Sequence, residues 1–288
     1  MNAPRFCHLK CLDSRGLHRM AYWEWGEPTN PRVLICVHGL SRQGRDFDTL
    51  ARGLCATYRV VCPDVVGRGR SDWLADPIGY AIPSYVADMV SLVARLGVDE
   101  VDWVGTSMGG LIGLSLASLP NNPVRRLVLN DVGPAINAAG LQRIASYIGR
   151  PAHWSSLEEA ADALWAVSQG FGPHTREQWL ELTRPQLVAD GDGFKSHYDP
   201  AISAPFRVIT PEAVAAGEAL LWQAYERIRC PALLLRGADS DVLSPATAQA
   251  MTQRGPKARL HEFAGVGHAP MMVQPEQRAV VSEFLLGP

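Results

Sequence analysis

The sequence predicts an α/β protein built on a mostly parallel sheet, with helices on both faces. Short apolar runs of strand length alternate with longer runs whose apolar residues recur at helical spacing. Several short runs, such as 32–37 and 58–62, are apolar at nearly every position, which is typical of strands buried on both faces. Strands that alternate with helices in this way imply parallel pairing with right-handed crossovers.

Eight segments are predicted to form the strands. The first two, 6–12 and 17–25, are separated by the turn sequence Asp-Ser-Arg-Gly, which predicts an antiparallel hairpin. The other six predicted strands are 32–37, 58–62, 101–104, 124–129, 231–235 and 259–263. The helices between them are expected near 47–56, 82–96, 111–119, 210–228, from 245 onward, and at 275–286.

The regular alternation stops between residues 134 and 207. Several short amphipathic helical patterns replace it, and the stretch is rich in aromatic residues. We therefore expect residues 1–133 and 208–288 to form the α/β core, and residues 134–207 to form an inserted helical cap. Aromatic residues in such a segment more often pack internally than contact a substrate, so none is named as a site residue.

Composition excludes several classes of function. The chain has 288 residues, is 47% hydrophobic and 19% charged, and carries a formal net charge of −2. It has no dense run of lysine and arginine, which argues against a nucleic-acid partner. Residues 1–10 hold no apolar segment of signal-peptide length, and no stretch is long enough to span a membrane. These features predict a cytoplasmic protein with no membrane partner.

The six cysteines are dispersed along the chain without paired spacing. This distribution predicts reduced thiols rather than a disulfide framework or a metal site. No cofactor is implied, and the oligomeric state is not predicted.

The stretch from Val101 to Gly110 carries the strongest chemical signal. It reads V-D-W-V-G-T-S-M-G-G, an apolar strand, a sharp turn and the start of a helix, with Ser107 at the apex. Gly105 and Gly109 lie two residues to either side, where a Cβ atom would collide across so tight a turn. This context predicts that Ser107 is a nucleophile exposed at a helix N-terminus, where developing negative charge is favoured.

A serine nucleophile needs a base, and the base needs an orienting carboxylate. His268 lies in the loop after the last predicted strand, and Asp241 lies in the loop after strand 231–235. Loops at the carboxyl ends of parallel strands are where α/β proteins place their sites. The order Ser107, Asp241, His268 is that of the α/β-hydrolases.

The chain resembles the α/β-hydrolase superfamily, in its small, capped, single-domain form, over nearly its whole length. The resemblance rests on His38-Gly39, the loop 64–71, the serine turn, the loop 237–245 and the run 267–270. It implies an eight-stranded, mostly parallel sheet. It also implies an oxyanion hole formed by the backbone N–H groups of Leu40 and Met108.

Two other aspartates compete for the role of the acid. In the family a proline often follows the acid by four residues, and Pro245 stands in that register to Asp241 but not to Asp239. The upstream register differs by one residue, because Asp241 is four residues after Gly237 where the family commonly has three. A minority of the family takes its acid from the position of Asp131, but that residue is interpreted as a loop-forming group.

The predicted function is hydrolysis of a carboxylic ester, or a related acyl bond, of a small to medium substrate. The Ser-Met-Gly-Gly turn also resembles that of carbon–carbon hydrolases from ring-cleavage pathways, although those usually have tryptophan where this chain has Ala269. An enol-lactonase is a further alternative. A non-catalytic ligand receptor is disfavoured because it would not need all three groups of a triad.

Overall fold

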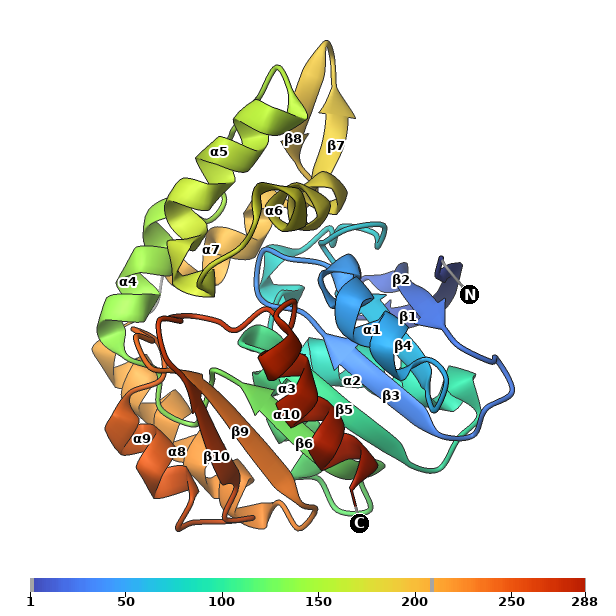
Figure 1. Cartoon of the computed structure of the whole chain (residues 1–288), viewed down its shortest axis with the longest axis vertical. Helices are drawn as coiled ribbons and strands as arrows, with labels where there is room; N and C mark the ends of the chain where they lie inside the picture. The colour runs from blue at the N-terminus through green and yellow to red at the C-terminus, as the bar shows by residue number, and fades with distance from the viewer. Residues whose placement is uncertain (1–2, 208–209, 288) are drawn as a thin grey trace.

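The computed structural model describes residues 3–207 and 210–287. Its centre is an eight-stranded sheet in the order β1-β2-β4-β3-β5-β6-β9-β10 (Figure 1). The strands are β1 (Arg5–Asp13), β2 (Gly16–Trp25), β3 (Val33–Val37), β4 (Arg59–Asp64), β5 (Val101–Thr106), β6 (Val124–Asn130), β9 (Ala232–Gly237) and β10 (Arg259–Phe263). The expected eight-stranded, mostly parallel sheet is confirmed.

Only the amino-terminal edge of this sheet is antiparallel. Strand β1 pairs with β2, and β2 with β4, in antiparallel register, whereas the strands from β4 to β10 pair in parallel. The carboxyl ends of the parallel strands therefore lie along one edge. The loops that follow β3, β5, β6, β9 and β10 meet there, and they carry every residue that the sequence singled out for catalysis.

Helices cover both faces of the sheet, and alternate side chains of each central strand serve the two layers. Ile35 packs into the cluster that includes α2 and α3, whereas Leu34 and Cys36 pack into the cluster that includes α1 and α10. These flanking helices are α1 (Asp48–Leu54), α2 (Ile82–Leu96), α3 (Met108–Ala117), α8 (Pro211–Arg227), α9 (Pro245–Met251) and α10 (Pro275–Leu286). Burial on both faces explains the continuous apolar runs in the sequence.

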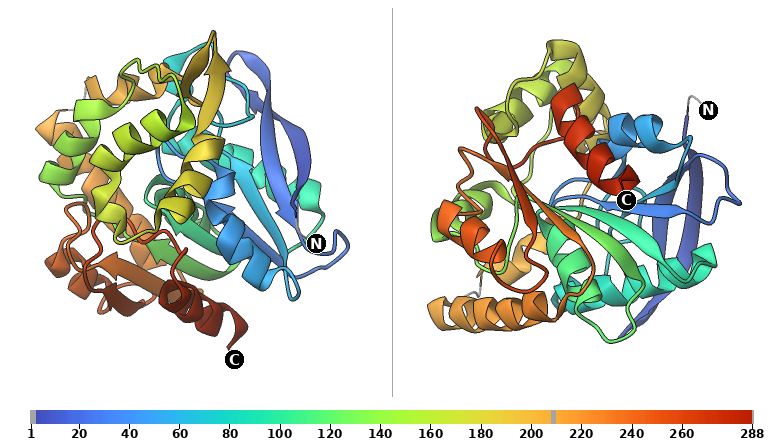
Figure 2. Two further views of the ribbon diagram at one scale, coloured as in Figure 1. Left: turned by 45° about the horizontal axis from the view of Figure 1, so that its top comes forward. Right: turned by 60° about the horizontal axis from the view of Figure 1, so that its bottom comes forward.

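The segment between β6 and α8 forms a separate group of elements at one end of the molecule (Figures 1 and 2). Its elements are α4 (Ala138–Tyr147), α5 (Leu157–Ser168), α6 (Arg176–Thr183), β7 (Leu187–Asp190), β8 (Gly193–Ser196) and α7 (Ala204–Arg207). The β7–β8 hairpin was not expected, because its strands have only four residues each and the Gly-Asp-Gly sequence indicated only a loop. The boundary expected after residue 207 falls at residues 208–209, outside the described residues.

None of the helices in residues 3–207 and 210–287 combines the length and apolar character that crossing a bilayer requires.

Glycines allow α3 to lie directly against the sheet. A Cβ atom on Gly109 would lie 2.0 Å from the carbonyl oxygen of Val37, and one on Gly113 would lie 2.2 Å from Nε1 of Trp103. The Trp103 indole N–H also donates a hydrogen bond to the Gly109 carbonyl, at 3.1 Å. The helix that begins beside Ser107 is thus held in place by close backbone contact.

We expect Gly109→Ala to destabilise the fold by about 2–3 kcal/mol, because the backbone of β3 must move to admit the methyl group. The matched control is Gly217→Ala in α8, where a Cβ atom would meet nothing within 4 Å. That change should stabilise the protein by about 0.5–1 kcal/mol through helix propensity. Urea denaturation checks both values, and equal stability of the two variants would contradict the close-packing argument.

Candidate active site

Ser107 occupies a strained turn between β5 and α3. Its backbone has φ 52° and ψ −116°, a conformation that non-glycine residues rarely adopt. A Cβ atom on Gly105 would lie 2.2 Å from the carbonyl oxygen of Gly109, so glycine is required two residues before the serine. The expected strand–turn–helix context of Ser107 is confirmed, and its hydroxyl is directed to the carboxyl edge of the sheet.

His268 lies between Ser107 and a carboxylate. Its Nε2 is 2.9 Å from Oγ of Ser107, and its Nδ1 is 2.7 Å from Oδ2 of Asp131. The loop that carries it is fixed at Gly267, whose N–H donates to the carbonyl of Gly170 at 2.7 Å. The structure therefore joins Ser107 to His268 as expected, but the third member differs from the prediction.

Asp131 is the carboxylate that contacts His268. Its side chain is fully buried, and besides His268 it accepts hydrogen bonds from the Gly237 N–H at 3.0 Å and the Ser240 hydroxyl at 2.6 Å. Its own N–H donates to the carbonyl of Leu235 at 2.8 Å. Three donors around one buried carboxylate fix its position beside the imidazole.

The expectation that Asp241 orients His268 is wrong. The Asp241 carboxylate instead accepts two hydrogen bonds from Arg143, at 2.5 and 2.8 Å, and the Arg143 guanidinium lowers the pKa of Asp241. The reason lies in the sheet order, because β6 lies between β5 and β9 and its end is adjacent to Ser107. The loop after β9 turns Ser240 toward Asp131, which leaves Asp241 facing α4.

The two expected oxyanion donors flank Ser107. Met108 is the first residue of α3, so its N–H has no acceptor within the helix. Leu40 lies in the loop after β3, and a Cβ atom on the preceding Gly39 would be 3.7 Å from Cβ of Ser107. Both backbone positions are therefore beside the serine, where N–H groups can face a developing oxyanion.

His38 fixes the backbone of the Leu40 loop. Its Nε2 accepts a hydrogen bond from the Val65 N–H at 2.9 Å, and its Nδ1 lies 2.7 Å from the carbonyl oxygen of Gly39. Burial lowers the pKa of His38 to about 3. The ring is consequently neutral at ordinary pH, with both nitrogens already engaged, which suits a structural group and not a base.

Sequence reasoning missed Arg68, which is fully buried beneath this loop. Its guanidinium donates to the carbonyl of Leu40 at 2.8 Å, to the carbonyl of Val66 at 2.7 Å and to the Tyr85 hydroxyl at 3.0 Å. It also approaches Sδ of Met108 to 3.5 Å. Arginine is rarely buried, so nothing in the sequence marked this residue as a contact of both Leu40 and Met108.

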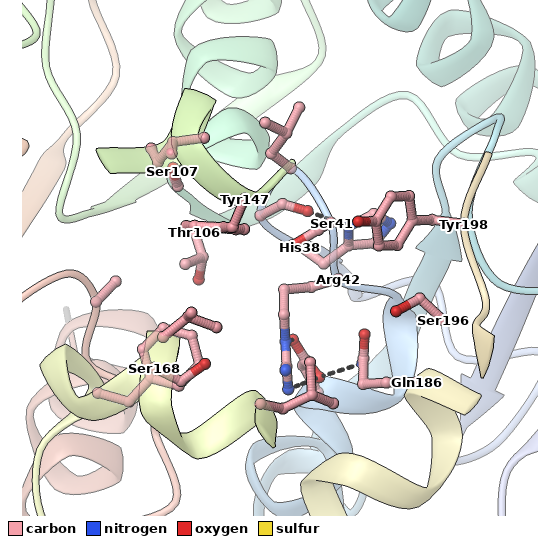
Figure 3. A pocket seen from close by; sticks show the side chains of 18 of the residues that line it. His38, Ser41, Arg42, Thr106, Ser107, Tyr147, Ser168, Gln186, Ser196 and Tyr198 are labelled. Carbon is pink, nitrogen blue, oxygen red and sulfur yellow. Dashed lines mark hydrogen bonds and ion pairs between the residues drawn. The ribbon is translucent and has the colours of Figure 1, made fainter. Parts of the chain in front are cut away.

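Ser107 and His268 open into a cavity of about 260 Å³. Figure 3 shows how Ser107, Thr106, Arg42 and Tyr198 surround it. One part of its wall comes from the loops at the carboxyl edge of the sheet, and the other from residues 134–207. The wall is mostly apolar, with a small number of polar and cationic side chains, which is typical of small-molecule sites.

Comparison with known proteins identifies the family of this chain. A family model described as the alpha/beta hydrolase family matches residues 34–281. This chain belongs to the α/β hydrolase family.

The hydrolase is 53% identical over 289 residues to a 3-hydroxybutyrate-oligomer hydrolase of Cupriavidus necator, with 99% of each chain covered. It is 29% identical over 276 residues to a 2-hydroxy-6-oxo-2,4-heptadienoate hydrolase of Pseudomonas putida, with 89% of each covered. A solved structure of a putative hydrolase from Rickettsia typhi matches with a TM-score of 0.89 and 30% identity, over 98% of this chain and 99% of that one. The expected fold and the hydrolase class are confirmed.

One group of side chains away from Ser107 has the composition of a metal site. The ligand atoms of Cys11, His18 and Asp88 lie within 4.8 Å of one another, close enough to hold one ion. His18 Nε2 and Asp88 are hydrogen-bonded at 3.1 Å, and burial raises the pKa of the Cys11 thiol to about 12. A neutral thiol beside a His–Asp hydrogen bond accounts for this cluster as a buried polar contact between the β1–β2 hairpin and α2.

The position of Asp131 leads to a reversed mutational expectation. Asp131→Asn should lower kcat by about 10⁴-fold, because the amide cannot hold His268 in the tautomer that accepts a proton from Ser107. Asp241→Asn should change kcat by no more than about threefold, because it removes only the charge that pairs with Arg143 and leaves the Asp131–His268 contact in place. Steady-state ester hydrolysis by both folded variants checks this. A larger loss of kcat in Asp241→Asn than in Asp131→Asn would support Asp241 as the acid, as the sequence predicted.

Proposed function

We propose that this hydrolase cleaves the ester bonds of short 3-hydroxybutyrate oligomers, or of close 3-hydroxyalkanoate analogues, by acyl transfer through Ser107. The observation that carries the proposal is the hydrogen-bonded series Ser107–His268–Asp131, which opens into a mostly apolar cavity. The substrate class is supported by 53% identity over the full length to an enzyme named for that substrate.

The proposed reaction begins with attack of Ser107 Oγ on the ester carbonyl carbon while His268 Nε2 takes the hydroxyl proton. Asp131 orients the imidazole and stabilises its charged form. The backbone N–H groups of Leu40 and Met108 donate to the oxyanion of the tetrahedral intermediate. The C–O bond of the ester then breaks, the departing alkoxide takes the proton from His268, and an acyl-enzyme remains.

Water completes the cycle. His268 takes a proton from the water as its oxygen attacks the acyl carbon, and the second tetrahedral intermediate collapses with return of that proton to Ser107 Oγ. The products are two shorter hydroxy acids. His268 serves in turn as base and acid, so no metal or cofactor enters the proposed steps.

We further propose that residues 134–207 act as a cap that limits the length of the substrate. Arg143, Tyr147, Trp154 and Phe171 from this segment line the cavity beside Ser107 and His268. The cavity volume of about 260 Å³ is slightly below that of most ligand sites, which span roughly 300–1,000 Å³. A cavity of this size favours dimers and trimers over long polyester chains.

Carbon–carbon bond hydrolysis is a second candidate. It is favoured by the Ser-Met-Gly-Gly turn and by 29% identity to the heptadienoate hydrolase. We prefer the ester substrate because the identity to the oligomer hydrolase is higher and extends over 99% of both chains.

The proposal is tested with the purified dimer and trimer of 3-hydroxybutyrate, with product release followed by chromatography. Ser107→Ala should lower turnover about 10⁴- to 10⁶-fold, because no other group takes the place of the nucleophile. Ser115→Ala in α3, outside the cavity, is the matched control and should retain wild-type turnover. A phosphonate that reacts with active serines should label Ser107 in the wild type. Turnover of Ser107→Ala within tenfold of wild type would exclude this mechanism.

A further inference from the structure

The cavity wall carries more positive than negative charge. Three guanidinium groups line it, those of Arg42, Arg143 and Arg150, against the single carboxylate of Asp46 among the described lining residues. The chain as a whole has a formal net charge of −2, so this cationic wall is a local feature and does not follow from composition.

Two of these arginines are already neutralised. Arg42 donates two hydrogen bonds to Asp46, both at 2.7 Å, and Gln186 holds the same carboxylate at 3.0 Å. Arg143 is paired with Asp241 in the same two-bond geometry. Breaking the Arg42–Asp46 pair to bind a substrate would leave a carboxylate without its partner in a largely buried site, which is costly.

Arg150 differs from the other two. Within residues 3–207 and 210–287, no carboxylate or other acceptor is paired with its guanidinium, and the residue is exposed while still lining the cavity. It therefore provides an uncompensated positive charge where the cavity meets solvent.

The backbone beneath Arg150 is fixed at several points. Its own N–H donates to the carbonyl of Tyr147 at 3.2 Å, and the N–H of Gly149 donates to the Tyr198 hydroxyl at 3.3 Å. Gly149 has φ 72°, and a Cβ atom there would lie 2.5 Å from Oγ of Ser203, so the chain passes this point in close contact. The free guanidinium is thus presented from an ordered turn at the end of α4.

We propose that Arg150 is a specificity-determining residue that binds the free carboxylate end of the oligomer, an inference that rests on the proposed function. A 3-hydroxybutyrate oligomer has one terminal carboxylate, and a guanidinium recognises a carboxylate through two parallel hydrogen bonds. In a dimer that carboxylate belongs to the alcohol side of the scissile ester. Arg150 accordingly holds the unit that leaves first, while Ser107 retains the acyl unit.

The test compares the dimer acid with its methyl ester, which has the same scissile bond but no terminal charge. Arg150→Gln should raise KM for the acid about tenfold with kcat within about twofold, and should leave both constants for the methyl ester unchanged. Arg150→Lys should recover part of the loss, because it keeps the charge but not the two-pronged geometry. The matched control is Arg184→Gln, an exposed arginine of the same segment that does not line this cavity, and it should match the wild type.

An unchanged ratio of acid to methyl-ester KM in Arg150→Gln would overturn the Arg150 proposal while leaving the esterase mechanism intact. If the wild type cleaves only neutral esters, the proposed oligomer substrate is wrong, and the carboxylate site is then tested by inhibition of 4-nitrophenyl butyrate hydrolysis. In that assay, inhibition by the 3-hydroxybutyrate anion that weakens about tenfold in Arg150→Gln supports the site. Equal inhibition of both proteins overturns it.

Discussion

The positive φ of Ser107 is the constraint on which the rest of the site depends. That conformation lets a strand pass directly into a helix and leaves the side chain at the edge of the sheet. It persists because the surroundings permit no other path: Gly105 and Gly109 face backbone at distances that exclude any Cβ atom. The cost of the strained residue is met by the close packing of α3 on the sheet.

The parallel sheet then determines which loops can reach the serine. Because β3, β5 and β6 are neighbours, the residues that follow them converge without long connections. Leu40 lies in the loop after β3, Met108 begins the helix after β5, and Asp131 is the first residue after β6. Buried groups such as Arg68 and His38 fix the loop backbone, so the proposed oxyanion donors need little reorganisation during reaction.

Charge is distributed unevenly around the cavity. Arg42 and Arg143 line the cavity wall, but each is paired with an aspartate, Asp46 or Asp241. Neither arginine therefore has an unpaired charge. Asp241 thereby has a structural use that its position in the sequence did not suggest, because it neutralises Arg143 of α4. Among the described residues of the wall, Arg150 is the unpaired cation beside these two ion pairs. One unpaired charge favours an anionic group at that position and does not make the whole cavity strongly positive.

The sequence alone determined the fold, the serine turn and the position of the histidine after the last strand, because these depend on local periodicity and on glycine spacing. It did not determine the acid. Asp131 and His268 are separated by 137 residues, and their contact depends on the place of β6 beside β5 in the sheet. The same holds for Arg68, Arg143 and Arg150, since no local pattern states whether an arginine is buried, paired or free. Only the tertiary structure decides which charged groups find partners, because pairing depends on distances between segments that are remote in the chain.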